Sequence, residues 1–268
     1  MITTDLLSIE AIRTGLSASI VGRQLFLFGE VESTNAVLRN LAQVGAREGT
    51  VVLAEAQLHG RARLGRQWFS PGNVNLYVSV LFRPAFPPVE APRFAFIAGL
   101  ALADAVKVLG LSPAIKWPND VLVERKKVGG SLAECGTRGD TIEYLILGVG
   151  VNLNVDVESL RRALGPAGLA ATSLAAALGH EVDRNVFAAS YLNHLDRWAL
   201  RYRQEGAAPI LAAWRDRDIL TGRRVEARGD GHAFDGRALG VDAEGHLVVG
   251  DSHGARRTVL TEEVRVLD

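Results

Sequence analysis

The sequence predicts an α+β protein with a central mixed β-sheet and a small β unit at its C-terminus. Up to about residue 155, apolar runs of strand character such as NLYVSVL and LILGVGV are interspersed with helical patterns. Beyond residue 218 the chain consists of short β segments separated by Gly-Asp-Gly, Glu-Gly and His-Gly turns. We therefore expect one domain over residues 1–217 and a small barrel over residues 218–268.

The periodicity of apolar residues places the individual elements. Strands are expected at 24–31, 50–57, 75–82, 115–117, 121–124, 128–134 and 141–152, with a basic turn at 125–127. Helices are expected at 5–16, between Ser33 and Gly45, and at 92–109, 156–164, 172–179, 184–204 and 207–217. The aromatic and aliphatic stripe on the helix at 184–204 indicates packing rather than a ligand site.

Composition limits the class of protein. The 268 residues include 30 basic and 30 acidic side chains, so the formal net charge is +0 and there is no global attraction to nucleic acid or membrane. The single cysteine, Cys135, cannot form an intramolecular disulfide, which favours a reducing compartment. The N-terminal residues lack a secretory signal pattern, and no apolar run reaches the ~18 residues that span a bilayer. These features predict a cytoplasmic protein.

The stretch HGRARLGR at 59–66 has the composition of an anion-binding loop. It holds three arginines and two glycines, and it leads through an aromatic pair into a strand. Backbone N–H groups can approach a phosphate where side chains are absent, and arginine supplies forked donors. A solvated surface loop is the alternative. Since it contains little that is apolar, we expect this loop to be mobile without a ligand and to close over one.

Polar residues at the start of a helix form a second candidate. Ser33, Thr34 and Asn35 have the chemistry of a helix start, and a plain cap is the simpler interpretation. The free N–H groups of the first turn could also receive a ligand carbonyl. The six histidines are scattered without metal-ligand spacing, so no protein-bound metal is expected.

Four segments taken together resemble the biotin protein ligases, which attach biotin to carboxyl carrier proteins. They are STN at 33–35, GRARLGRQWFSPGNVNLYVS at 60–79, KWPNDV at 116–121 with KKVGG at 126–130, and LGVGVNLN at 147–154. The resemblance implies a catalytic domain of the biotin/lipoate ligase type followed by an SH3-like barrel. Two residues depart from the family pattern. Ala62 replaces a loop glycine, and alanine would be strained there if the position needs positive φ, unless the loop closes differently. Ser131 replaces an aliphatic residue.

The resemblance also implies a two-step reaction and a set of site residues. Biotin's carboxylate attacks the α-phosphate of ATP to give biotinyl-5′-AMP and pyrophosphate, and a carrier lysine then displaces AMP. For biotin binding it implies Ser33, Thr34, Asn35, Gln57, Gly60, Arg61, Lys127, Gly129 and Gly130. For nucleotide binding it implies Arg61, Ala62, Arg63, Trp68, Lys116, Asn119 and Asn152. The catalytic residues implied are Lys127, Arg63, Arg61 and Asp120, the last as a Mg²⁺ ligand or a proton acceptor.

The implied substrates are ATP and biotin with Mg²⁺, and the implied partner is a biotin carboxyl carrier protein. A monomer or a homodimer is compatible with the sequence. The enzymatic alternative is a lipoate-type protein ligase. A biotin-responsive regulator is a second alternative, but only about 23 residues precede the first expected strand, too few for a winged-helix DNA-binding domain, so no DNA binding is expected. A non-catalytic biotin-binding module would leave the loop arginines and Lys127 without a purpose.

Overall fold

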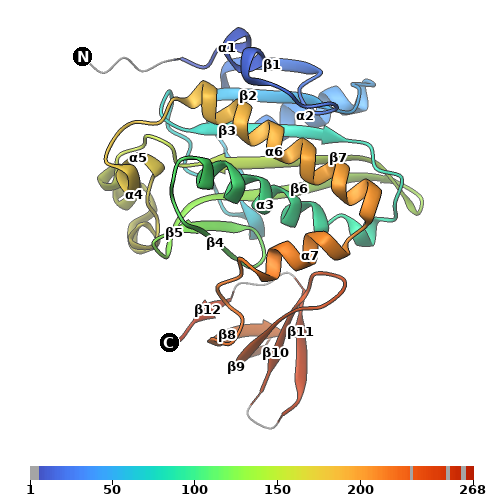
Figure 1. Ribbon diagram of the computed structural model, residues 1–268, viewed down its shortest axis with the longest axis vertical. Helices are drawn as coiled ribbons and strands as arrows, with labels where there is room; N and C mark the ends of the chain where they lie inside the picture. Colours follow the sequence, from blue (N-terminus) through green and yellow to red (C-terminus); the bar gives the residue numbers. More distant parts are fainter. Residues whose placement is uncertain (1–5, 230–231, 252–253, 261–263) are drawn as a thin grey trace.

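The computed structural model describes residues 6–229, 232–251, 254–260 and 264–268, and a seven-stranded mixed sheet forms its centre (Figure 1). The spatial order of the strands is β1-β2-β3-β7-β6-β5-β4. Their bounds are β1 Gln24–Val31, β2 Thr50–Gln57, β3 Leu76–Phe82, β4 Pro113–Lys116, β5 Asp120–Val123, β6 Lys126–Arg138 and β7 Thr141–Val151. Only β1 and β2 pair in parallel, and the other neighbours are antiparallel.

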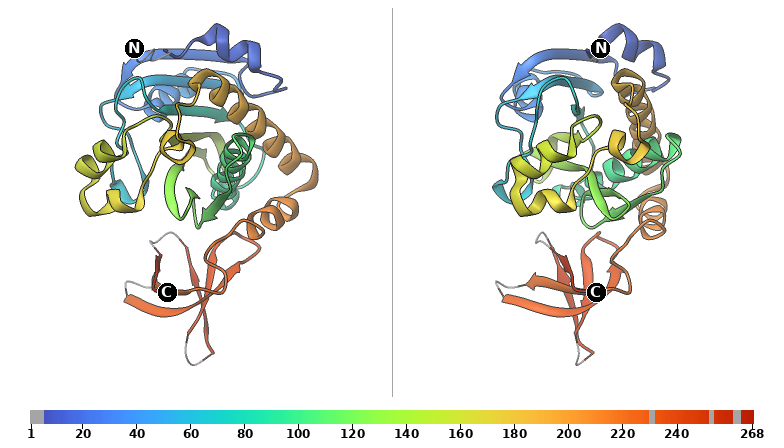
Figure 2. Two further views of the ribbon diagram at one scale, coloured as in Figure 1. Left: turned by 60° about the vertical axis from the view of Figure 1, so that its left-hand side comes forward. Right: turned by 90° about the vertical axis from the view of Figure 1, so that its left-hand side faces the viewer.

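Helices cover the two faces of this sheet unequally. The long helices α3 (Arg93–Val108) and α6 (Arg184–Glu205) pack together over one face, while α2 (Thr34–Gln43) lies on the other (Figures 1 and 2). The shorter helices are α1 (Ile9–Gly15), α4 (Val157–Leu164), α5 (Leu174–Leu178) and α7 (Ala208–Arg215). Since α2 packs mainly on β2, β3 and β7, part of its face of the sheet is left without a helix.

The central strand β7 shows how the sequence assigns these faces. Its residues alternate between the two faces, as strand geometry requires. Leu145, Leu147 and Val149 belong to the large core beneath α3 and α6, whereas Tyr144 and Ile146 pack in the smaller cluster beneath α2. Further along the α2 face, β7 carries only glycine at 148 and 150. Next to α2 the strand therefore presents only backbone, on which side chains from other elements can lie directly.

Two buried carboxylates tie the helices to the rim of the sheet. Glu55 on β2 pairs with Arg184 at the start of α6 at 2.6 Å and also accepts the backbone N–H of Leu7. Asp196 on α6 accepts the backbone N–H groups of residues 19, 20 and 21. Breaking a buried pair leaves an uncompensated charge, so these contacts fix the geometry beside the bare surface.

A second, five-stranded antiparallel sheet follows α7, in the order β11-β10-β9-β8-β12. Its strands are β8 Arg224–Gly229, β9 His232–Val241, β10 Leu247–Gly250, β11 Arg256–Val259 and β12 Arg265–Val266. The turn between β9 and β10 contacts the segment that joins β4 and β5, where Trp117 Nε1 donates to the carbonyl of Gly245 at 3.0 Å. The predicted central sheet and small C-terminal β unit are thus confirmed, while the domain boundary at 217/218 stays a prediction.

The linker between the two sheets is held by a carboxylate on α3. Asp104 accepts a hydrogen bond from Trp198 Nε1 at 2.7 Å and one from Arg217 Nη2 at 2.9 Å. Burial opposes ionisation of Asp104, but hydrogen bonds from His194 and Trp198 and the charge of Arg217 outweigh it, so the pKa of this carboxyl is lowered. The contact joins α3, α6 and the linker.

The predicted strands and helices of the larger domain are present, but most of their ends differ from the prediction by one to four residues. The strands at 24–31 and 50–57 have the predicted bounds. The basic segment at 125–127 was predicted as a turn, but the turn lies at Glu124 and Arg125, both at positive φ, and Lys126 already begins β6. This places Lys127 on a strand, where its side chain has a fixed direction.

Candidate active site

The floor of the candidate site is backbone without side chains. Gly150 on β7 pairs with Gly130 on β6, and Gly148 lies two residues away on the same face. A Cβ atom at Gly148 would lie 2.2 Å from Asn35 Oδ1, and one at Gly150 would lie 2.5 Å from the indole of Trp68. Two side chains from other elements therefore rest directly on the strand, which explains why the strand carries glycine here.

A buried polar network forms one end of the site. Thr34 N–H donates to Gln57 Oε1 at 2.9 Å, and Gln57 Nε2 donates to Ser70 Oγ at 3.0 Å. Ser79 on β3 lies 2.8 Å from Thr34 Oγ1 and donates to Asn35 Oδ1 at 2.6 Å. The predicted residues 33–35 and Gln57 are thus brought together. Ser33 is the N-cap residue of α2, but its side chain makes no capping hydrogen bond, so the plain-cap interpretation is wrong for its hydroxyl.

The basic loop folds into a tight turn above this floor. Ala62 N–H donates to Arg66 O at 2.8 Å, and Trp68 N–H donates to Gly60 O at 2.8 Å. The left-handed backbone falls on Leu64, with φ 57°, and on Gly65, with φ 71°. Ala62 itself is extended, with φ −128°, so replacing glycine at this position causes no backbone strain in this conformation.

Two of the loop's arginines reach toward other elements. Arg61 Nη1 lies 3.4 Å from Glu134 Oε1, which also accepts from Arg39 at 2.8 Å. The guanidinium of Arg63 lies 5.9 Å from the centroid of the Trp117 ring. Since the side chain of Arg61 is 47% exposed, its pairing with Glu134 is weak and readily exchanged for another anion.

Lys127 projects from β6 beside the floor. Its ammonium lies 2.6 Å from Asp120 Oδ1 and 5.2 Å from the centroid of the Trp68 ring. Trp68 Nε1 is buried and has no hydrogen-bond partner among the residues that the structure describes. A cation, a carboxylate and an indole therefore meet over Gly130 and Gly150.

A buried tyrosine fixes the segment that follows Trp68. Tyr77 on β3 donates its hydroxyl to Pro71 O at 2.8 Å. Burial raises the pKa of Tyr77 well above its ordinary value, so the hydroxyl remains a donor at neutral pH. A cleft of about 420 Å³ opens beside this segment, and Gln57, Gly60 and Trp68 line it. Lys127, Asp120 and the glycines of the floor do not line this cleft, so it lies beside the candidate site and not over its floor.

The other predicted residues lie at the margin of the floor and have structural partners. Asn119 Nδ2 donates to Ser131 O at 2.6 Å, and Asn152 Nδ2 donates to Thr172 O at 3.1 Å. Lys116 ends β4 opposite Asp120. A Cβ atom at Gly129 would lie 2.7 Å from Leu102, on the α3 face of the sheet. The structure thus joins Gly130 to the floor and places Gly129 against the core.

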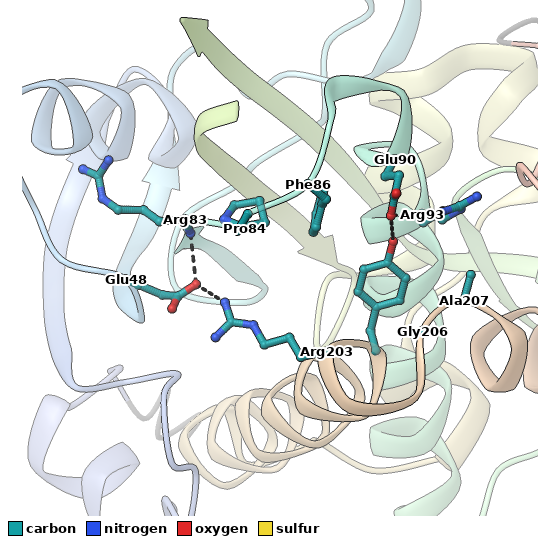
Figure 3. A pocket seen from close by; sticks show the side chains of 11 residues that line it. Glu48, Arg83, Pro84, Phe86, Glu90, Arg93, Arg203, Gly206 and Ala207 are labelled. Atoms are coloured by element: carbon teal, nitrogen blue, oxygen red, sulfur yellow. Dashed lines mark hydrogen bonds and ion pairs between the residues drawn. The ribbon is translucent and has the colours of Figure 1, made fainter. Parts of the chain in front are cut away.

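A larger cavity, of about 670 Å³, lies at the far end of β3 (Figure 3). Its arginines are already engaged: Arg203 and the backbone N–H of Arg83 bond to Glu48, and Figure 3 shows the guanidinium of Arg83 turned away from the opening. Tyr202 donates to Glu90 there at 2.5 Å. This cavity contains none of the predicted site residues.

Comparison with known proteins identifies the family. The profile of the Biotin/lipoate A/B protein ligase family matches residues 27–152. The biotin--[acetyl-CoA-carboxylase] ligase of Paracoccus denitrificans is 33% identical over 242 residues, covering 89% of this chain and 98% of the relative. This chain belongs to the biotin protein ligase family.

Two further relatives agree with this assignment. The bifunctional ligase/repressor BirA of Bacillus subtilis is 31% identical over 252 residues, which cover 94% of this chain and 77% of the relative. The structure of the biotin protein ligase from Aquifex aeolicus in complex with biotin and ATP superposes with a TM-score of 0.75 at 25% identity. It covers 91% of this chain and 99% of the other. The resemblance seen in the sequence is confirmed.

The second departure of this biotin protein ligase from the family pattern also has a structural explanation. Ser131 faces α3 rather than the site floor, and its hydroxyl lies 3.5 Å from Ala95 O. A polar side chain is therefore satisfied at this buried position by a helix carbonyl.

The donor set near Lys127 does not form a protein metal cage. In the described part of the chain, the one group of three metal-ligating side chains within reach of one another is Asp242, Glu244 and His246, in the turn between β9 and β10. Near the floor, Asp120 is the carboxylate next to Lys127. This arrangement fits Mg²⁺ held mainly by nucleotide phosphates, with at most one protein carboxylate.

None of the described helices is long and apolar enough to cross a membrane.

Some residues of the site were not predicted from the sequence. Ser79 and Glu134 contribute through partners far away in the chain, and the sequence contains no signal for those pairings. Tyr77 acts on Pro71, six residues away, but its burial is not evident from the sequence. Gly148 and Gly150 could have been found, because two glycines at a spacing of two within an apolar strand indicate close approach on one face.

Proposed function

We propose that this biotin protein ligase binds biotin and ATP on the floor formed by Gly130, Gly148 and Gly150. The enzyme activates biotin with ATP and transfers it to a lysine of a biotin carboxyl carrier protein. In support, one relative is named biotin--[acetyl-CoA-carboxylase] ligase, and a similar solved structure holds biotin and ATP. The observation that carries the assignment of the site is the meeting of Lys127, Asp120 and Trp68 above bare backbone, next to a buried polar network.

The polar network is the proposed site for biotin's ureido group. That group offers one acceptor and two donors, and Ser33, Thr34, Asn35 and Gln57 offer hydroxyl and amide partners at its predicted position. Ser33, Thr34 and Asn35 are all buried, so these partners act in a medium in which hydrogen bonds are strong. Gly60 and Gly130 let the loop and the strand approach the ring system.

The loop and the indole form the proposed site for the reacting anions. Arg61 and Arg63 bind the carboxylate and the phosphates, with the backbone of Ala62 between them. Trp68 packs against the adenine or fixes the loop. Lys116, Asn119 and Asn152 are proposed at the nucleotide margin, where the latter two also hold the backbone.

The chemistry requires cations rather than a nucleophilic side chain. In the first step, a biotin carboxylate oxygen attacks the α-phosphorus and pyrophosphate leaves, so negative charge accumulates at one place. The Lys127 ammonium, held at 2.6 Å from Asp120, turns to that charge as a mobile donor. In the second step, the carrier lysine attacks the acyl carbon and AMP leaves. Asp120, released by Lys127, is the nearest carboxylate to receive the proton.

Several finer features belong to the same proposal. Mg²⁺ arrives with the nucleotide, and the reaction takes place in the cytoplasm. Residues 1–217 form the catalytic domain and residues 218–268 the small β domain. The acceptor is a carboxyl carrier protein.

An ATP–pyrophosphate exchange assay tests the proposed function. Biotin and lipoate are supplied separately at equal concentration with Mg-ATP. We expect exchange with biotin and only background exchange with lipoate. Exchange with lipoate alone would establish the lipoate-type alternative, and transfer to a purified carrier protein should follow only where exchange occurs.

A further inference from the structure

Glu134 on β6 links the two ends of the site. Its Oε2 accepts a hydrogen bond from Asn35 Nδ2 at 2.7 Å. Its Oε1 accepts from Arg39 Nη2 at 2.8 Å and lies 3.4 Å from Arg61 Nη1. One carboxylate therefore touches the polar network and a loop arginine together, although the reaction outlined above assigns it no role.

Two acceptors favour the observed orientation of Asn35: the carboxylate of Glu134, 2.7 Å from Nδ2, and more weakly the carbonyl of Leu132, 3.5 Å from Nδ2. Since both oxygens of a carboxylate only accept, Asn35 must present its NH₂ group to Glu134. Its Oδ1 then faces Ser79 Oγ at 2.6 Å, and it lies on the bare backbone at Gly148. Asn35 is 4% exposed, so no water is available to support the opposite orientation.

The orientation of the Asn35 side chain also determines which hydroxyl group donates and which accepts at Ser79. The single hydroxyl hydrogen of Ser79 is used on Asn35 Oδ1, so Ser79 cannot also donate to Thr34 Oγ1, 2.8 Å away. The Thr34 hydroxyl donates instead, either to Ser79 or to Gln57 Oε1 at 3.2 Å. The Thr34 oxygen then has only lone pairs left for a ligand. With Glu134 in place, Thr34 therefore offers an acceptor toward the pocket, and Ser79 becomes free to donate to the Thr34 oxygen only if Asn35 turns over.

The other end of the network has an independent anchor. Ser70 donates its hydroxyl to Trp68 O at 2.9 Å, so Gln57 must present Nε2 to Ser70 and Oε1 to the Thr34 N–H. Gln57 is therefore held from the loop side and does not depend on Glu134. Since Thr34 Oγ1 can also donate to Gln57 Oε1, the Asn35–Ser79 pair is the part of the network that takes its direction from the carboxylate.

We propose that Glu134 is a positioning residue that fixes the hydrogen-bond direction of the ureido pocket and so selects a ligand with a ureido group. The proposal rests on the proposed function, because it takes the network as the site of biotin. With glutamine at 134, an NH₂ group can face Asn35, which can then turn over. The donor and acceptor pattern offered by Asn35, Ser79 and Thr34 is no longer unique.

The test compares Glu134→Gln with Glu143→Gln, a matched control on the same β6–β7 hairpin. Glu143 pairs with Arg138, whose side chain is 81% exposed, outside the network. Pyrophosphate release is measured with biotin and with 2-iminobiotin, in which C=N–H replaces the ureido carbonyl so that a donor stands in place of the acceptor. KM for each ligand, KM for ATP and kcat are recorded, and thermal unfolding verifies folding.

We expect Glu134→Gln to raise KM for biotin roughly tenfold and to leave kcat within about twofold of the wild-type value. The preference for biotin over 2-iminobiotin should fall by a similar factor. Glu134→Asp, which still only accepts, should keep more of that preference than Gln does, and Glu143→Gln should keep all of it.

Two results would overturn the proposal. An unchanged preference in Glu134→Gln would show that the carboxylate does not set the direction, and an equal rise in KM for both ligands would indicate a merely structural role. If wild-type protein and Glu143→Gln both fail to use biotin, the proposed function itself is wrong, and that outcome is distinct from either of these.

Discussion

Gly150→Ala is expected to disable adenylation without unfolding the protein. The added methyl group would lie 2.5 Å from Trp68 Cε2 and Nε1 and 3.0 Å from Cδ1. Carbon atoms in contact are separated by ~3.5–4.0 Å, so the indole must retreat by roughly 1 Å. The indole ring can move because the loop next to it is exposed. The strand β7 cannot move, because it is paired with β3 on one side and with β6 on the other.

The size of the effect follows from what the indole touches. Its ring centroid is 5.2 Å from Lys127 Nζ, so a shift of the ring changes the space in which the lysine and the reacting anions meet. A misplacement of ~1 Å can cost ~10²-fold in rate, equivalent to ~2.7 kcal/mol of activation free energy. We therefore expect pyrophosphate release with biotin and Mg-ATP to fall about 10²-fold, with a thermal midpoint close to that of the wild type.

Gly29→Ala is the matched control for this experiment. It makes the same chemical change on β1, where a Cβ atom would meet nothing within 4 Å and φ is not positive. Its activity should equal that of the wild type. A Gly150→Ala enzyme within twofold of the control would refute the reasoning, because the floor would then tolerate a side chain.

Three further predictions follow from the same geometry. Lys127→Ala should lower the rate of adenylate formation ~10²-fold or more through loss of a preorganised cation, while Lys126→Ala, measured in the same assay, should be near wild type. Amide hydrogen exchange at 59–67 should slow when biotin and ATP are added, and equal protection in both states would exclude closure of the loop. Because the pKa of Asp104 is lowered in the fold, its contribution is present above the unfolded pKa of ~3.9 and is lost as pH falls through the folded value. Asp104→Asn should therefore cost about 1–3 kcal/mol in urea unfolding at pH 7, and the difference from wild type should shrink below pH ~4.

The sequence predicted the strands and long helices because their apolar periodicity is strong. The buried run of β3 and the alternation of β7 each admit one interpretation, and both strands are where they were expected. The prediction misplaced the turn before Lys127 because Glu124 and Arg125 adopt positive φ. Neither residue type favours that conformation, so the sequence does not indicate it.

The candidate site was predictable only where its residues form local motifs. The loop at 59–66 and the polar start of α2 are contiguous in sequence, and their composition drew attention to them. Glu134 is 99 residues from Asn35 and 73 from Arg61 in the chain, so their contacts arise only when β6 is placed beside β7. Ala62 would have been strained had its position needed positive φ, but Ala62 is extended and the positive φ falls on Leu64 and Gly65.

The mass of the small-molecule product tests the central claim most directly. The purified chain is incubated with Mg-ATP and an equimolar mixture of biotin and lipoate, and the products are analysed by mass spectrometry after denaturation. We predict biotinyl-5′-AMP together with pyrophosphate, at a level that falls in Lys127→Ala. Formation of lipoyl-AMP, or of no adenylate at all while the protein remains folded, would contradict the account.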